Sequence, residues 1–331
     1  MLRIHFTGED LGRIRIATGP DPMWEMLLSL HRLRRRDSGV LLGPWVRESL
    51  PKVPETTRAL TALAPPFGYS PDFLTPAVGG GLADRLEALR STPLRQVTKD
   101  LREFTVQNPR RRLPACHRQL VAGDPEAVGK LADAAHAYVD TVLDPYWERI
   151  WAQVSRDRAR RSAVLAEGGW DAVLRTLHPS AHWEYPVLRV AFPVEQDLHL
   201  GGRGLLLQPS FFCRYAPTTF ADPALPPVLV HPIEHEPHWA TPEAGPADGR
   251  SLAALIGPTR AVLLSALADG VTTTGELARR AGTTPPNASR HIAALREAAL
   301  VSSHRHRNAT LHTVTELGRA LLEGRHVSLR A

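Results

Sequence analysis

Two helical segments separated by a very short turn constrain the fold of this chain more than any other feature. Residues 274–281 and 285–299 both repeat apolar side chains at helical spacing, and Gly282 between them is a typical helix terminator. Pro285 suits the first position of the second helix. A further amphipathic helix is expected at 258–268, just before this pair. The pattern therefore predicts a helix-turn-helix.

The second of these helices has one apolar face, and hydrogen-bonding side chains flank that face at its amino-terminal end. The apolar face, which is expected to pack in the core, comprises Ala288, Ile292, Leu295 and Ala299. A helix laid in the major groove brings its amino-terminal side chains nearest to the base edges. The side chains predicted to contact DNA there are Thr284, Asn287, Ser289, Arg290 and His291. The alternative is that they only cap the helix and contact solvent.

A β-hairpin is predicted to follow this helix. Val301 and Ser303 lead up to the turn "HRHRNA", and a second alternating segment leads away from it. We predict that residues 303–312 form a wing whose tip contacts phosphates or the minor groove. The tip carries His304, Arg305, His306, Arg307 and Asn308. Thr315 is expected to cap a final helix over 316–323.

Positive charge is concentrated in the same region. The net charge of the 331-residue chain is +6, and residues 250–331 alone hold 11 Arg and 5 acidic residues, so the first 249 residues balance to zero. A basic segment attached to a neutral body is typical of a nucleic-acid-binding module. A solvated basic tail is the alternative interpretation. We predict double-stranded DNA as the partner.

The segment "ASRHIAALREAALV" resembles the signature of the ArsR-type winged helix-turn-helix regulators, Ser-x-His-hydrophobic-x-x-Leu-(Arg)-x-Ala-Gly-Leu-Val. The later segment "TVTELGRALL" is similar to the family's last helix, which follows a Thr-x-x-Gly. The resemblance covers about 70 residues. It implies that the DNA is contacted by Asn287, Ser289, Arg290 and His291, and that Arg305 and Arg307 serve the wing. We expect a homodimeric repressor that reads an inverted-repeat operator.

The sequence departs from the family pattern at three points. Ala299 stands where the family usually has Gly, and Arg307 with Asn308 stands where it often has Gly-Arg. The helix before the turn, "GELARRA", lacks the Cys-x-Cys pair of the family's metal sensors. The resemblance therefore implies a regulator that senses something other than a metal, or that has no small-molecule signal.

The rest of the chain predicts an α+β fold, namely a largely helical amino-terminal region with a small β-sheet. The chain is expected to open with two strands that have Thr7 to Asp10 as their turn, and Asp21 and Pro22 are expected to begin a helix. Further helices are expected near 54–64, 81–106, 112–122 and 125–166, with a break at Pro145 and an end at Gly168 and Gly169. The expected later strands are 185–192, 202–212 and 226–233. Residues 146–232 weakly resemble an actinobacterial class of such regulators.

The composition of residues 240–250 predicts a linker between two domains. We place a dimerisation or sensory region at 1–245, and the linker with the winged helix-turn-helix at 246–331. No apolar run approaches the roughly 20 residues that a membrane crossing needs, and the start of the chain lacks a secretion signal. We expect a cytoplasmic protein without a membrane partner.

The segment "HPIEHEPHW", residues 231–239, contains the H-x-x-E-H pattern of a family of zinc peptidases. Pro232 and Pro237 make the required helix implausible, so we interpret the segment as a strand leaving the core with its His and Glu side chains in solvent. No cofactor is predicted. The remaining alternative is a structural or sensory metal held by His231, His235 and His238.

Other residues raise weaker alternatives. Cys116 and Cys213 are expected to be reduced, buried thiols. Gly79 to Gly81 precede a helix, but a simple loop is favoured over a phosphate cradle. An unknown effector pocket is conceivable at Trp147, Trp151, Trp183, Tyr185, Phe211 and Phe212, and packing in the core explains these residues equally well. We expect no enzymatic activity, and the alternative is an enzyme with an appended winged helix.

Overall fold

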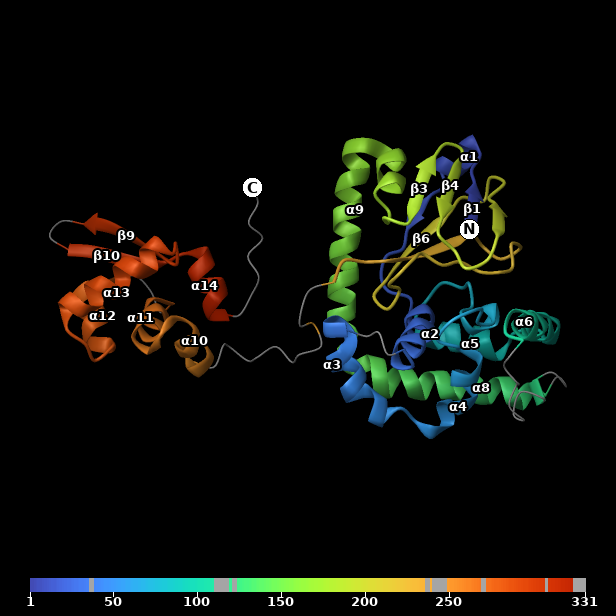
Figure 1. Ribbon diagram of the computed structural model, residues 1–331, viewed down its shortest axis with the longest axis horizontal. Coiled ribbons are helices and arrows are strands. Elements are labelled where there is room, and N and C mark those ends of the chain that lie inside the picture. The colour runs from blue at the N-terminus through green and yellow to red at the C-terminus, as the bar shows by residue number, and fades with distance from the viewer. Residues whose placement is uncertain are drawn as a thin grey trace. The chain divides into compact units, whose positions relative to one another are not determined.

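The protein is described by a computed structural model, which divides into two compact units, Met1–Ala240 and Thr241–Ala331 (Figure 1). The described residues are 1–35, 39–109, 119–120, 124–235, 239, 249–268, 272–306 and 309–323. Both units combine helices with small sheets, so the predicted α+β class is confirmed. Among these residues, no helix has both the length and the apolar character that crossing a membrane requires.

Helices form one end of the amino-terminal unit, and the strands gather at the other (Figure 1). The helices are α2 (Pro22–Leu33), α3 (Gly39–Ser49), α4 (Arg58–Leu63), α5 (Leu82–Arg90), α6 (Leu94–Gln107), α8 (Pro125–Tyr138) and α9 (Trp147–Arg175). The predicted start of α2 is confirmed, because Asp21 accepts hydrogen bonds from the backbone amides of Met23 and Trp24. The predicted helix over 112–122 lies mostly outside the described residues.

The two predicted interruptions of the long helical region are confirmed. Residues Val139–Leu143 form a π-helical turn and Asp144–Tyr146 a 3-10 turn, because Pro145 cannot donate a backbone hydrogen bond. Gly169 has φ of 64°, so α9 bends there before it ends at Arg175. This long helix packs against both the helical end and the strands.

The strands form two small sheets. One has the order β3-β4-β1-β5, from Ala181–Glu184, Val187–Val190, Leu2–His5 and Gln196–His199, and the other has the order β2-β6-β7, from Arg15–Ile16, Leu206–Ser210 and Val228–Pro232. The expected pairing of the two opening strands is wrong. The intervening residues form a short helix α1 (Gly8–Leu11) capped by Thr7, and each strand instead pairs with residues almost 200 positions away.

Each end of this unit has its own apolar core. The helical core includes the fully buried Trp45, Tyr138, Phe211 and Phe212. The sheet core includes Leu2, Ile4 and Leu188, with Val173 and Leu174 contributed by the end of α9. The contact of α9 with both cores joins the two ends into one unit.

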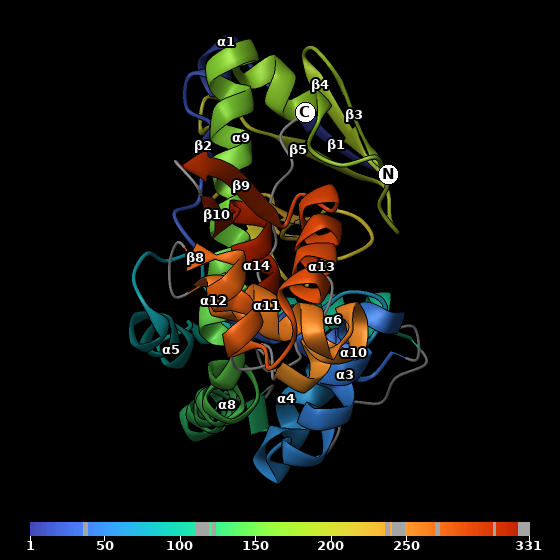
Figure 2. The ribbon, with the colours of Figure 1, turned by 90° about the vertical axis from the view of Figure 1, so that its left-hand side faces the viewer.

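The carboxyl-terminal unit contains the predicted helix-turn-helix and wing (Figure 2). Its elements are α10 (Gly249–Ile256), α11 (Pro258–Ala268), β8 (Thr272–Thr273), α12 (Thr274–Arg280), α13 (Pro285–Glu297), β9 (Val301–His306), β10 (Ala309–Val314) and α14 (Glu316–Glu323). The sheet has the order β8-β10-β9. The predicted linker overlaps the start of α10, a helix that was not predicted.

Candidate nucleic-acid interface

The turn between α12 and α13 lies where the sequence predicted, but Thr273 and Glu276, which have capping-box spacing, form only half of that box at the start of α12. Thr273 caps α12, since its side-chain oxygen accepts a 3.4 Å hydrogen bond from the amide of Glu276. The Glu276 carboxylate does not complete a capping box, because it pairs with Arg279 and Arg280 at 2.5 and 2.9 Å. Gly282 ends the helix with φ of 60°, a backbone conformation that is strained for residues other than glycine.

The buried face of α13 comprises Ala288, Ile292 and Leu295, which pack with Leu263, Leu264 and Leu277 of the preceding helices. The prediction that Ala299 belongs to this face is wrong. The helix ends at Glu297, and Ala299 lies beyond it, exposed and with φ of 57°. Ala299 occupies the left-handed position where the family resemblance expects glycine.

The end of α13 closes through a Schellman motif built without glycine. The amide of Leu300 donates a 2.9 Å hydrogen bond to the carbonyl oxygen of Leu295, and the amide of Ala299 donates a 2.9 Å hydrogen bond to the carbonyl oxygen of Arg296. Leu300 and Leu295 are both buried in the core of this unit, as the apolar contact of this motif requires. The helix therefore stops in a defined conformation, and β9 starts at Val301 in a fixed direction.

Among the predicted DNA-reading side chains, Arg290 points away from the buried residues of α13, whereas Asn287, Ser289 and His291 flank the buried face and Thr284 precedes the helix. Thr284, Ser289 and Arg290 are exposed, and Asn287 and His291 are half-buried. The Asn287 side chain donates to the Thr283 hydroxyl at 2.7 Å and accepts a 3.0 Å hydrogen bond from the Arg290 guanidinium. This relay holds the Arg290 side chain on the outer surface of the helix.

The predicted wing is an antiparallel pair of strands. Val301 pairs with Val314 at its base, and Arg305 pairs with Thr310 near its tip. The side chains of His304 and Arg305 are exposed. Arg307 and Asn308, which were also predicted to contact DNA, lie outside the described residues. The wing lies beside the helices α11 to α13 in both views of the unit (Figures 1 and 2).

A buried histidine that sequence reasoning missed joins the wing to the helix-turn-helix. His312 of β10 is 5% exposed, and its ring nitrogens contact the hydroxyls of Ser303 at 2.8 Å and Thr274 at 2.8 Å. Burial, followed by the charge of Arg296, lowers the pKa of His312 below its usual value. The alternation of polar residues in "TLHTV" gave no signal that this one faces inward.

Thr315 caps α14 as predicted. Its hydroxyl accepts a 3.0 Å hydrogen bond from the amide of Gly318 and donates to the carbonyl oxygen of Ala299 at 2.7 Å. A side chain at Gly318 would overlap the Leu300 carbonyl oxygen, which explains the glycine in this segment. The last helix is thereby fixed against the end of α13.

The prediction that the histidines of residues 231–239 lie in solvent is wrong for His231. The prediction of a strand is confirmed by β7, but His231 is completely buried in it, because both faces of this strand are covered. Its Nδ1 donates to the Pro232 carbonyl oxygen at 3.0 Å, and burial lowers its pKa to about 3. His235 donates from Nε2 to the Phe211 carbonyl oxygen at 2.6 Å. Glu234 is exposed, as expected, and pairs with Arg160.

His231 and His235 each use one ring nitrogen in these contacts, and Nε2 of His231 is buried without a hydrogen-bond partner. His238 lies outside the described residues, and among the residues that are described no group of three potential metal-ligating side chains occurs. The Gly79 to Gly81 segment leads into α5. The carboxylate of Asp84 accepts a 2.9 Å hydrogen bond from the amide of Gly81, which is an amide that a bound phosphate would otherwise use.

The six aromatic residues that might have lined an effector pocket are scattered instead. Phe211 and Phe212 are buried in the helical core, Trp147 is partly buried against that core, and Trp183 is buried in the sheet core. Trp151 and Tyr185 are 46% and 57% exposed. Cys213 is a free, buried thiol as expected, and Cys116 lies outside the described residues.

Comparison with known proteins supports the interpretation of the carboxyl-terminal unit. Residues 255–304 match a family model described as a helix-turn-helix domain. Among solved structures, the transcriptional repressor BigR from Xylella fastidiosa is similar, with 30% sequence identity and a TM-score of 0.20, over 22% of this chain and 74% of that chain. No curated protein matches the sequence. Residues 255–304, which include α11, α12 and α13, are therefore a helix-turn-helix domain, a module of DNA-binding transcriptional regulators.

Proposed function

We propose that this protein is a sequence-specific DNA-binding transcriptional repressor of the ArsR type. In this proposal α13 enters the major groove, where Arg290 reads a base edge, and the wing at 303–312 contacts the backbone or the minor groove. The observation that carries the proposal is the hydrogen bond between Arg290, which is exposed, and Asn287 on α13. Both residues lie within the segment that matches a helix-turn-helix domain. The net charge of +6 in residues 250–331 favours a polyanionic partner.

We further propose that the protein acts as a homodimer on an inverted repeat. Two copies related by a two-fold axis would place two α13 helices in successive major grooves. Large apolar side chains are exposed on three helices of the DNA-binding unit, namely Leu255 on α10 (73%), Val262 on α11 (46%) and Leu317 on α14 (36%). Their burial between two copies would provide favourable apolar contact. Residues 1–245 would contribute to dimerisation or sensing.

The experiment starts from operators selected by the purified full-length protein from a random DNA pool. The affinities of the wild type and of variants for a selected operator are then measured by fluorescence anisotropy at several salt concentrations. We expect Arg290→Ala to weaken specific binding by about 10- to 100-fold, since a bidentate base contact is worth roughly 1–3 kcal/mol. Arg305→Ala and Arg307→Ala should weaken binding to all sequences and reduce the salt slope by about 1 each.

The matched control is Arg58→Ala, which removes one exposed arginine from the other unit, where it pairs with the exposed Glu55. This variant should bind the operator like the wild type. Unchanged affinity in both Arg290→Ala and the wing variants would refute the proposed DNA surface. Selection of no common sequence from the pool would refute sequence-specific binding.

A further inference from the structure

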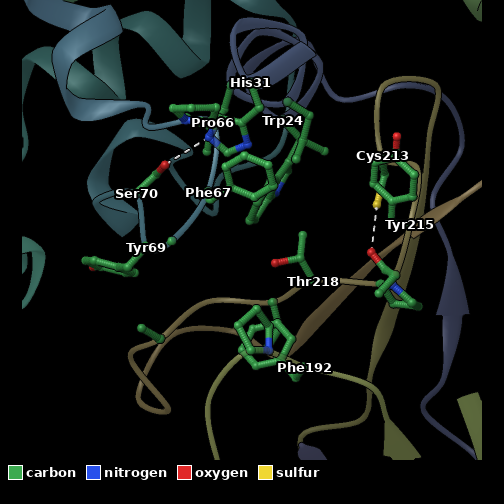
Figure 3. A pocket seen from close by; sticks show the side chains of 18 of the residues that line it. Trp24, His31, Pro66, Phe67, Tyr69, Ser70, Phe192, Cys213, Tyr215 and Thr218 are labelled. Carbon is green, nitrogen blue, oxygen red and sulfur yellow. Dashed lines mark hydrogen bonds between the residues drawn. The ribbon is translucent and has the colours of Figure 1, made fainter. Parts of the chain in front are cut away.

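The amino-terminal unit contains a cavity of about 480 Å³ (Figure 3). Five separate segments of the chain line it, namely residues 24–35, 66–75, 192–196 and 213–221 together with Gln107. A volume of this size lies within the range of about 300–1,000 Å³ that is typical of small-molecule sites. The cavity is therefore large enough for an organic ligand with several rings.

The segments that line the cavity are joined to one another by hydrogen bonds. The carboxylate of Asp72 accepts hydrogen bonds from the amides of Ala221 (3.1 Å) and Asp222 (2.8 Å). The Gln196 side chain donates a 2.8 Å hydrogen bond to the carbonyl oxygen of Phe220. The cavity is therefore formed by the fold itself, as ligand sites commonly are.

Most of the cavity wall is apolar or aromatic. In Figure 3, Trp24 and Phe67 lie on one side of the space, and Thr218 and Phe192 lie on the other. A wall of this kind favours an apolar ligand, because binding removes apolar surface of both the ligand and the protein from water.

Several large apolar side chains of the wall also reach solvent. Phe67 is 66% exposed, Tyr215 is 47% exposed and Val194 is 41% exposed. Exposed apolar side chains that gather at one place, rather than singly, are typical of binding sites. Since these lining residues are in contact with solvent, a ligand can reach the cavity from outside.

One hydrogen-bonded polar pair lies in the wall. Nε2 of His31 and the hydroxyl oxygen of Ser70 are 3.0 Å apart. His31 is neutral, because burial and then the charges of Arg32, Arg34 and Arg35 lower its pKa to about 3. Whichever of the two side chains donates, the Ser70 oxygen keeps a lone pair. The pair can therefore accept a hydrogen bond from an N–H or O–H group of a ligand.

The charged side chains of the wall contact groups of the protein itself. The guanidinium carbon of Arg35 lies 4.1 Å from the centre of the Phe67 ring and 4.6 Å from the centre of the Tyr215 ring. That of Arg32 lies 4.9 Å from the centre of the Tyr215 ring. The Asp72 carboxylate accepts the two amides described above. A ligand therefore needs no charge of its own here, and an ionised group would lose its hydration on entering.

We propose that this cavity binds an uncharged aromatic molecule, one with several rings and a single N–H or O–H group. The rings would lie against Trp24, Phe67 and Phe192, and the polar group would donate to the Ser70 oxygen. Binding at this site requires no DNA, so the proposal is independent of the proposed function.

The test uses two fluorescent probes that differ in charge. N-phenyl-1-naphthylamine is uncharged and has aromatic rings with one N–H group, and 1-anilinonaphthalene-8-sulfonate has the same rings and a sulfonate. Both probes are titrated into the full-length protein and followed by their emission. We expect saturable binding of the uncharged probe at one site per chain. Its affinity should be about 10-fold higher than that of the anionic probe, whose sulfonate would lose its hydration.

Substitutions that fill the space assign the binding to the cavity. Thr218→Trp should abolish binding of the uncharged probe. Val194→Trp, at a wall position that is 41% exposed, is a second filling variant in case the first does not fold. The matched control is Val78→Trp, because Val78 is 39% exposed and is not one of the lining residues. This control should bind the probe like the wild type.

Two smaller substitutions test the proposed contacts. Ser70→Ala should weaken the uncharged probe by about 3- to 10-fold, since it removes one hydrogen bond. Phe67→Ala should weaken it by about 10-fold, since it removes one of the rings that the probe would contact. The controls Ser91→Ala and Leu50→Ala remove an exposed hydroxyl and an exposed apolar side chain outside the cavity wall, and they should leave binding unchanged.

Several outcomes would overturn the proposal. If both filling variants fold, as judged by circular dichroism, and still bind the uncharged probe like the wild type, the probe binds elsewhere. Equal or tighter binding of the anionic probe would mean that the cavity does not select an uncharged ligand. Losses in the Ser91 and Leu50 controls equal to those in the Ser70 and Phe67 variants would refute the proposed contacts. Absence of saturable binding would refute the site altogether. None of these results depends on whether the protein binds DNA.

Discussion

At the scale of single residues, Ala299 is the position where the chain holds a conformation that its side chain disfavours. Its φ of 57° lies in the left-handed region, which costs a residue with a β-carbon roughly 1–2 kcal/mol. The surrounding Schellman hydrogen bonds hold it there. The connection from α13 to β9 fixes this backbone conformation, so Ala299 adopts it despite the strain.

We expect Ala299→Gly to stabilise the DNA-binding unit by about 0.5–1 kcal/mol. Glycine removes the left-handed strain, and the greater freedom of glycine in the unfolded chain offsets part of the gain. Hydrogen exchange of the α11 backbone amides in the full-length protein should slow accordingly. The matched control is Ala298→Gly, since Ala298 has φ of −79° and gains nothing from glycine. If both variants are destabilised alike, strain at Ala299 is not significant.

At the scale of elements, the wing is held to the helices by a side chain rather than by strand pairing alone. His312 contacts a hydroxyl of β9 and a hydroxyl of α12 through its two ring nitrogens. A neutral imidazole donates through one nitrogen and accepts through the other, and the hydroxyls can complement either arrangement. A charged imidazole could only donate, and it would have to be buried.

We therefore expect the pKa of His312 in the folded protein to lie below its usual value of 6.5. Because the folded pKa is lowered, the stability that this residue contributes is complete above pH 6.5 and is lost as the pH falls through the folded value. Proton NMR of the histidine rings should show one signal that titrates below the usual range and that disappears in His312→Gln. A His312 signal that titrates at 6.5 would contradict this description of the contact.

Apart from α10 and the short strand β8, the elements of the carboxyl-terminal unit were predictable because their signals are local. A capping threonine, a proline at the first helical position and a terminating glycine lie within a few residues of the helices that they delimit. The two opening strands were mispaired because their partners are β4 and β6, which no local pattern near Thr7 can reveal. The cavity of the amino-terminal unit that Figure 3 shows was missed for the same reason, since five separate segments line it and His31 and Arg214 are far apart in the sequence.

At the scale of the whole molecule, the two units can be observed separately. All seven tryptophans of the chain lie between residues 24 and 239, so intrinsic tryptophan fluorescence reports the amino-terminal unit alone. In that unit, the completely buried Glu25 of α2 accepts hydrogen bonds from the amides of Phe211 (2.8 Å) and Phe212 (3.0 Å) and from the hydroxyl of Ser210 (3.0 Å). This carboxyl group joins α2 to the end of β6.

We expect the free energy of unfolding of the amino-terminal unit to fall as the pH rises from 5 to 8. Burial raises the pKa of Glu25 to about 7, so its contribution is complete below the unfolded value of 4.5 and is lost as the pH rises through 7. For this group the loss amounts to about 3 kcal/mol. Urea unfolding followed by tryptophan fluorescence measures it.

The comparison with Glu25→Gln isolates this group from Asp72 and Asp100, whose pKa values are also raised by burial and which act in the same direction. The stability of the variant should depend less on pH than that of the wild type. Identical pH dependence in the two proteins would mean that Glu25 is ionised in the folded state throughout the range.

The relay from Thr283 through Asn287 to Arg290 has a consequence for how such a helix would read bases. Both ends of the Asn287 amide are engaged within the protein, so the paired contact that asparagine makes with adenine is available only after two internal bonds break. Arg290 is meanwhile ordered before any ligand arrives, so part of the entropy of fixing its long side chain is lost during folding rather than during binding. If α13 contacts DNA as proposed, this surface would be preorganised for guanine, which arginine contacts through two acceptors in the major groove.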